Sequence, residues 1–154
     1  MQKIAPFLWF DKDAGEAARF YTSIFPGSKI TSTKLFDNTP SGVIEIVSIE
    51  LFGQEYTLMA AGPMFKFTEA ISFVIRCDSQ EEIDYYWSKL SAEPNAEQCG
   101  WLKDKYGLSW QVVPTVLNTL LADKDAGKVA RVTAAFLKMK KFDIAALQRA
   151  YEGS

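Results

Sequence analysis

The sequence contains no histidine, the residue that most often serves as a general base and as a ligand for transition metals. Imidazole-based catalysis and imidazole metal sites are therefore excluded for this chain. Its two cysteines, Cys77 and Cys99, lie far apart and form no CxxC pair, so we expect reduced thiols in a cytoplasmic protein. A nucleophilic Cys99 would have no histidine to activate it, and a small packed thiol is the simpler interpretation.

Other features are scarce as well. No apolar run approaches the length of a membrane span and no basic-then-apolar leader is present, so we expect a soluble protein that is not exported. The formal net charge is only -2, which gives no reason to expect binding to nucleic acid or to a membrane surface. Gly15 and Gly27 are isolated, and no glycine-rich loop of the kind that holds a nucleoside cofactor is found.

What the chain does contain is enough apolar material for a core. Of its 154 residues, 48% are hydrophobic and 14% are aromatic, as in a folded globular protein. The length favours one domain built from two small halves. Apolar spacing predicts two amphipathic helices, which begin after Asp13 and Ser79 and carry a glutamate three residues later. A polar loop is expected at 37–42. Alternating and apolar stretches predict strands at 4–10, 29–36, 43–52, 55–61 and 70–76.

A weak internal repeat relates the two halves. The second predicted helix follows the first at a constant offset of 66 residues, and the segment 107–111 matches 53–57 at an offset of 54. The second half is therefore shorter between its helix and its last strand. We expect two modules, at 1–62 and at 69–114, each made of a strand, a helix and two or three strands.

The last part of the chain, 115–154, is expected to be a helical tail within one structural unit. A short helix is predicted at 116–121, and two more are predicted to begin after Asp125 and Asp143. Three roles stay open for these helices: they cover an edge of a sheet, they clasp a partner subunit, or they simply pack at the end of the fold.

Several blocks of the sequence resemble one known family. They are Pro6–Phe10, Ala17–Tyr21, Phe65–Phe73, Asp84–Trp87, Cys99–Asp104 and Tyr106–Pro114. Together they are similar to the vicinal oxygen chelate superfamily, which includes glyoxalase I and the bleomycin-resistance proteins, and within it to the PhnB-like family labelled "3-demethylubiquinone-9 3-methyltransferase". The resemblance implies an α+β fold of paired βαβββ modules whose sheets curl around a cavity, followed here by C-terminal helices. It also implies a homodimer, and whether the two chains intertwine stays open.

The resemblance also places the ligand site. The metal ligands of the superfamily map, within one residue, to Pro6, Thr57, Ser72 and Gln111, and the position of Gln111 usually holds a carboxylate. Strand parity assigns the residues that alternate with these, such as Phe7 and Trp110, to the face covered by helices. The residues expected to contact a ligand are Leu8, Phe10, Thr57, Met59, Ser72, Trp101 and Gln111.

The mapped side chains are neutral, and a proline, two hydroxyls and one amide do not balance the charge of a divalent cation. We therefore predict no metal and no other cofactor, and we assign no catalytic residue. An oxygen-only metal site is the alternative, if the strand register places carboxylates in the cavity. The candidates for it are Glu45, Glu50, Glu55 and Glu69, which are otherwise interpreted as solvent-facing charges at strand ends.

Three functions follow from this sequence, and whether the protein is an enzyme stays open. The first, which we favour, is metal-free binding of a planar or hydrophobic small molecule in the cavity between the sheets, for sequestration or transport. The alternative is an enzyme of the same superfamily that uses an oxygen-only metal site or none. The third is an interaction module that works through its helical tail. The methyltransferase activity named in the family label is less favoured, because the sequence has no recognisable loop for its cofactor.

Overall fold

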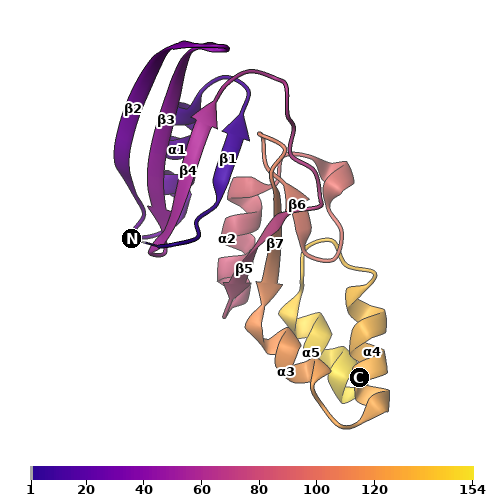
Figure 1. Cartoon of the computed structure of the whole chain (residues 1–154). Helices are drawn as coiled ribbons and strands as arrows, with labels where there is room; N and C mark the ends of the chain where they lie inside the picture. Colours follow the sequence, from indigo (N-terminus) through magenta and orange to yellow (C-terminus); the bar gives the residue numbers. More distant parts are fainter. Residues whose placement is uncertain (1) are drawn as a thin grey trace. The chain divides into compact units, whose positions relative to one another are not determined.

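The computed structural model describes residues 2–154 and divides the chain into two compact units, Met1–Lys66 and Phe67–Ser154. Each unit contains a β-sheet with a helix on one face (Figure 1). In the described part of the chain, no helix has the length and apolar character needed to cross a membrane.

The first unit has the order strand, helix and three strands. Its elements are β1 (Phe7–Phe10), α1 (Ala14–Ile24), β2 (Lys29–Thr39), β3 (Gly42–Leu51) and β4 (Gln54–Ala60). The four-stranded sheet has the order β1-β4-β3-β2, in which β1 pairs with β4 in parallel and the other pairs are antiparallel. This is one complete βαβββ module, as the resemblance implies.

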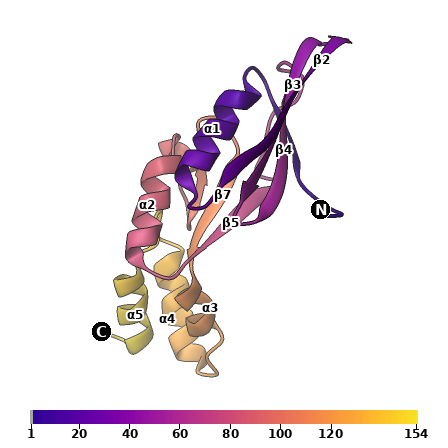
Figure 2. The same ribbon diagram turned by 90° about the vertical axis from the view of Figure 1, so that its left-hand side faces the viewer.

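Helix α1 packs against one face of this sheet (Figure 2). The side chain of Asp13 caps the helix by accepting a hydrogen bond of 2.7 Å from the backbone N–H of Glu16, as the sequence predicts. The core between helix and sheet is mostly aliphatic and aromatic. It includes Ala17, Tyr21 and Ile24 of the helix and Val47, Ile49 and Leu58 of the sheet.

The prediction of a loop at 37–42 is wrong. Strand β2 continues to Thr39, which pairs with Gly42, so the connection to β3 is a tight turn at Pro40 and Ser41. The strand pairing is irregular between Phe36 and Thr39, where the polar residues lie. Asn38 has a φ of 58° there, a left-handed conformation that asparagine tolerates better than most residues. The Thr39 hydroxyl also donates a 2.5 Å hydrogen bond to the Gly42 carbonyl across the turn.

The second unit begins with a shorter version of the same module. Its elements are β5 (Ser72–Cys77), α2 (Gln80–Leu90), the short 3-10 helix η1 (Pro94–Ala96), β6 (Trp101–Lys103) and β7 (Ser109–Pro114). They form a three-stranded sheet of order β5-β7-β6, one strand fewer than in the first unit.

The predicted repeat between the two helices is confirmed. Helices α1 and α2 each have 11 residues, and Ser79 accepts a hydrogen bond from the N–H of Glu82 as Asp13 does from Glu16. Helix α2 buries Ile83, Tyr86 and Leu90. This stripe packs against the sheet, principally against β7.

Three helices follow β7, as the sequence predicts. They are α3 (Thr115–Leu121), α4 (Ala126–Phe136) and α5 (Ile144–Glu152). Asp125 and Asp143 are confirmed as the residues that cap α4 and α5 with their side chains. The three helices pack on one another at the end of the chain (Figures 1 and 2).

The turn between β6 and β7 is organised by a buried carboxylate. Asp104 is fully buried and accepts hydrogen bonds from the backbone N–H groups of Tyr106 (2.9 Å) and Leu108 (3.1 Å) and from the indole N–H of Trp110 (2.9 Å). Hydrogen bonds to a charged acceptor in an apolar surrounding are among the stronger ones in proteins. Asp104 therefore fixes the turn and, through Trp110, the position of β7.

Replacing Asp104 by Asn is expected to lower the free energy of unfolding by about 1–3 kcal/mol, because one acceptor oxygen becomes an NH₂ group that faces a buried donor. Urea denaturation followed by circular dichroism measures this. The exposed Asp37 provides a matched control, and Asp37→Asn should change stability little. Equal stability of the two variants would contradict the assigned role.

Candidate functional site

The candidate site lies on the face of the β5-β7-β6 sheet that alternates with the helix-covered face. The pairing places Trp110 beside Phe73, and Val112 beside Ile75, on the face under α2. The other face holds Gln111 beside Val74 on one side and beside Trp101 on the other. The strand parity predicted for this half of the chain is therefore confirmed, and we call this second face the open face.

Gln111 and Ser72 are connected on the open face. The side-chain amide of Gln111 donates a hydrogen bond of 2.9 Å to the Ser72 hydroxyl, and both residues are half-buried. Trp101 is the cross-strand neighbour of Gln111 on β6 and is also half-buried. Three of the residues predicted to contact a ligand therefore lie together.

A further residue of this face was not among the predicted ligand residues. Ser109 is 1% exposed, and its hydroxyl has no hydrogen-bond partner among the residues that the structure describes. It pairs with Ser72 on one side and with Lys103 on the other. Buried hydroxyls are normally satisfied, so the unpaired Ser109 hydroxyl departs from the usual pattern. The only sign of this residue in the sequence was its position two residues before Gln111, which places both side chains on the same face of β7.

One charged pair stands at the edge of this face. The ammonium group of Lys103 forms an ion pair with the carboxylate of Glu69, in the segment that precedes β5. The hydrogen bond between them lowers the pKa of Glu69 and raises the pKa of Lys103. Both groups stay charged near neutral pH and compensate each other, so the open face carries no net charge from this pair.

In the first unit, the face assigned to Leu8 and Phe10 is wrong. The parallel pairing of β1 with β4 places Leu8 beside Leu58 and Phe10 beside Ala60. All four are buried, and the ring of Phe10 lies 6.3 Å from that of Tyr21 on α1. Leu8 and Phe10 therefore belong to the core under the helix, opposite to the face predicted for a ligand.

The face was predicted wrongly because the first unit has one residue more than the second between this strand and its helix. Thr57 pairs with Phe7 in the first unit, whereas Gln111 pairs with Val74 in the second. The first unit thus has one more residue between this strand position and its helix cap, and the 66-residue offset does not extend to β1. A shift of one residue exchanges the two faces of a strand. The side chains that share a face with Thr57 and Met59 are therefore Phe7 and Trp9. The position mapped to Pro6 is occupied by Phe7, whose side chain also has no metal-binding atom.

The four glutamates proposed for an oxygen-only site are spread over different contacts. Glu45 accepts a 2.6 Å hydrogen bond from the Gly15 N–H at the start of α1, where a carboxylate is favourable. Glu50 pairs with Lys29, and Glu69 with Lys103. Of the four, Glu50 and Glu55 adjoin each other as cross-strand neighbours. Within residues 2–154, no group of three cysteine, aspartate or glutamate side chains is arranged to hold a metal ion.

The two thiols differ in environment. Cys77 is fully buried, and burial, reinforced by the charges of Glu82 and Asp78, raises its pKa to about 12. Cys99 is half-buried, and its thiol lies 3.5 Å from the carbonyl oxygen of Phe136 as a hydrogen-bond donor. The chain has no histidine that could activate either thiol as a nucleophile.

Alkylation should distinguish these thiols. In the folded protein at pH 9, Cys77 stays protonated and shielded, so iodoacetamide should modify only Cys99, whereas both should react in denaturant, where Cys77 regains its ordinary pKa. Peptide mass spectrometry locates the label. The Cys99→Ser variant should show no modification until it unfolds. Rapid labelling of Cys77 in the folded state would contradict this assignment.

The fold defines a class of protein: the chain has the vicinal oxygen chelate fold, with a complete βαβββ module followed by a shortened one. A family model described as "3-demethylubiquinone-9 3-methyltransferase" matches residues 2–113. The chain belongs to this PhnB-like family, and the match to its model ends just before the three C-terminal helices.

One solved structure supports the same conclusion, and a second resembles the chain in its fold alone. A PhnB protein from Bacillus cereus, described as a putative 3-demethylubiquinone-9 3-methyltransferase, is 35% identical over 74% of this chain and 100% of its own, with a TM-score of 0.62. Protein PA1353 from Pseudomonas aeruginosa is 18% identical over 74% of this chain and 98% of its own, with a TM-score of 0.55.

A more distant structure is a variant of the fosfomycin resistance protein FosX from Listeria monocytogenes, complexed with Mn(II) and a dihydroxypropylphosphonic acid. It is 15% identical over 73% of this chain and 92% of its own, with a TM-score of 0.52. This likeness concerns the fold alone. No curated protein matches the chain.

Proposed function

We propose that the protein binds an uncharged, planar small molecule on the open face of the β5-β7-β6 sheet, without a resident divalent metal, for sequestration or transport. The observation that carries this proposal is the hydrogen-bonded pair of Gln111 and Ser72, which stands where the superfamily resemblance implies metal ligands. The homodimer implied by the resemblance and the cytoplasmic location expected from the cysteine content are part of the same proposal.

The polar groups of this face support recognition by hydrogen bonds. The Gln111 carboxamide uses one N–H on Ser72, which leaves its carbonyl oxygen and its second N–H for a ligand. The Ser72 hydroxyl accepts this bond and keeps its own proton to donate. A ligand edge with an adjacent N–H and C=O complements the Gln111 amide.

Trp101 supplies the apolar contact. It is the immediate cross-strand neighbour of Gln111, and cross-strand side chains on one face lie within contact distance. An indole ring stacks on flat ligands, while amide and hydroxyl groups beside it fix their orientation. This combination favours a flat, uncharged compound over a strongly charged one.

The donor set does not fit a divalent cation. Thr57, Ser72 and Gln111 are neutral, and Phe7 offers no donor atom, so none of these side chains itself compensates the charge of a dication. The enzyme alternative is favoured by one observation, the adjacent carboxylates of Glu50 and Glu55 on the same face as Thr57. Lys29, however, pairs with Glu50 at 3.6 Å and offsets part of this charge.

Metal retention separates the two functions. Protein incubated with Mn(II) or Zn(II) and then desalted should retain far less than one equivalent by elemental analysis, because hydroxyl and amide ligands hold these ions weakly. Glu50→Gln with Glu55→Gln is the matched variant and should give the same result. Near-stoichiometric metal in the wild type, lost in this variant, would establish the oxygen-only enzyme site instead.

A pair of probe compounds tests the binding site. Carbostyril, a planar bicyclic lactam, presents an adjacent N–H and C=O, whereas quinoline has similar size and shape without this edge. We expect the wild type to bind carbostyril about tenfold more tightly than quinoline, because two hydrogen bonds distinguish them. Ligand-observed NMR titration measures both affinities.

Gln111→Leu should abolish the preference for carbostyril, and Trp101→Ala should lower the affinity for both compounds by a similar factor. Gln148→Leu provides the control, since Gln148 is exposed on α5 in the tail, and it should bind as the wild type does. Equal affinity of the wild type for both compounds, or a preference that survives Gln111→Leu, would refute the proposed site.

A further inference from the structure

The turn that precedes β6 has an unusual backbone. Cys99 has a φ of 50° and Gly100 a φ of 83°, so two consecutive residues are left-handed. Glycine adopts this conformation readily, but cysteine does so rarely, and a strained residue of this kind persists only when its surroundings hold it. The segment that holds this turn belongs to the C-terminal tail.

The residues between α4 and α5 bond the turn directly. The N–H groups of Cys99 and Gly100 donate hydrogen bonds of 2.8 Å each to the carbonyl oxygens of Met139 and Lys140. The Gln98 side chain donates a further bond of 3.1 Å to the Leu137 carbonyl. Backbone and side-chain donors of the turn are thus satisfied by the tail.

Phe142 anchors the same segment. Its ring is 3% exposed and fills the space beside Gly100, where an added Cβ would lie 2.4 Å from the Phe142 Cε2 atom. No other residue type fits at position 100 without displacing this ring. The turn and the ring of Phe142 are therefore shaped to each other.

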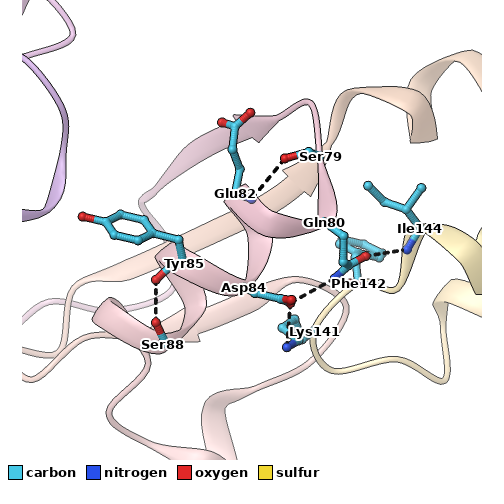
Figure 3. Close-up of polar contacts among 9 residues, drawn as sticks. All are labelled: Ser79, Gln80, Glu82, Asp84, Tyr85, Ser88, Lys141, Phe142 and Ile144. Carbon is cyan, nitrogen blue, oxygen red and sulfur yellow. Dashed lines mark hydrogen bonds and ion pairs between the residues drawn. The ribbon is translucent and has the colours of Figure 1, made fainter.

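The first turn of α2 holds the segment from another side (Figure 3). The side-chain amide of Gln80 donates to the Phe142 carbonyl (3.0 Å) and accepts from the Ile144 N–H (2.9 Å), so it bonds both sides of the cap of α5. Lys141 forms an ion pair with Asp84 at 2.8 Å. We call residues 136–144 the tail clasp.

The turn is also bonded to the candidate site. The Gly100 carbonyl accepts a 2.8 Å hydrogen bond from the N–H of Val112, the residue after Gln111. Trp101 follows the turn, and its N–H donates a 2.8 Å bond to the Gln98 carbonyl. The tail clasp therefore acts on a turn that borders Gln111 and Trp101.

We infer that the tail clasp is a positioning device for the ligand site: it holds the strained turn 98–100 and thereby sets Trp101 beside Gln111. This inference rests on the proposed function for its role in binding, but its structural part stands by itself. The clasp lies beyond residue 113, where the match to the family model ends. Ligand affinity in this chain accordingly depends on residues outside the family model.

The test uses the full chain with Gln80→Ala and Phe142→Ala combined, and Gln80→Ala alone as the milder variant in case the pair impairs folding. Tyr151→Phe is the control, because it removes the hydrogen bond between Tyr151 and Asp123 within the tail and leaves the clasp intact. Two readouts apply: hydrogen exchange by mass spectrometry, and the fluorine NMR signal of Trp101 in protein labelled with 5-fluorotryptophan, assigned through Trp101→Phe.

In the clasp variants, exchange should rise together in 136–144 and 98–103, and the Trp101 signal should shift or broaden, while 42–60 in the other unit stays unchanged. The control should match the wild type. If 136–144 is released and 98–103 and Trp101 keep their wild-type behaviour, the inference is wrong. Wild-type protection of 136–144 in the variants would also overturn it, since Gln80 and Phe142 would then not hold the clasp.

Carbostyril provides the binding readout. Its affinity should fall about tenfold in the clasp variants and stay unchanged in Tyr151→Phe, since looser positioning of contact residues weakens binding without removing a contact. If carbostyril fails to bind the wild type, the proposed function fails while exchange and the Trp101 signal still decide the structural part. Unchanged affinity in a variant with a released clasp would refute the positioning role.

Discussion

The register of β7 is the constraint on which the candidate site depends. β7 is the central strand of its sheet, and its alternation places Trp110 and Val112 under α2 and Gln111 on the opposite face. A slip of one residue would bury the polar Gln111 under a helix and expose the large ring of Trp110. The hydrogen bond from Trp110 to the buried Asp104 ties this register to the turn that starts the strand.

The same alternation explains both the success and the failure of prediction from the sequence. Period-two patterning is a local signal, so the faces of β5 and β7 follow from their own side chains. The face of β1 was inferred by counting back from a helix through an internal repeat, and one extra residue before Asp13 invalidates that count. Leu8 and Phe10 are apolar on a strand where both faces carry aromatic residues, so composition offered no correction. A pairing partner such as Leu58 is needed to decide, and pairing is a non-local property.

Helix positions were more predictable than the groups that hold the helices in place. Asp125 and Asp143 are local capping signals and mark α4 and α5 correctly, because a cap satisfies backbone groups within the same turn. The contact of Gln80 with Phe142 spans 62 residues, and nothing in the sequence near Gln80 distinguishes it from an ordinary first-turn residue. The unsatisfied hydroxyl of Ser109 is likewise a property of the folded surroundings and not of its neighbours in the sequence.

A site built from neutral groups has consequences for selectivity. A metal ion attracts any suitably placed anionic oxygen, whereas an amide and hydroxyls are weak attractors whose value lies in direction. A ligand that covers the Gln111 amide and leaves it unpaired bears the cost of desolvating it, and this penalty discriminates more strongly than the attraction itself. Such a penalty requires that the polar groups cannot move to find other partners. Rigid support of the strand edge around Trp101 and Gln111 is therefore worth more to this site than it would be to a metal centre, where the ion itself organises its ligands.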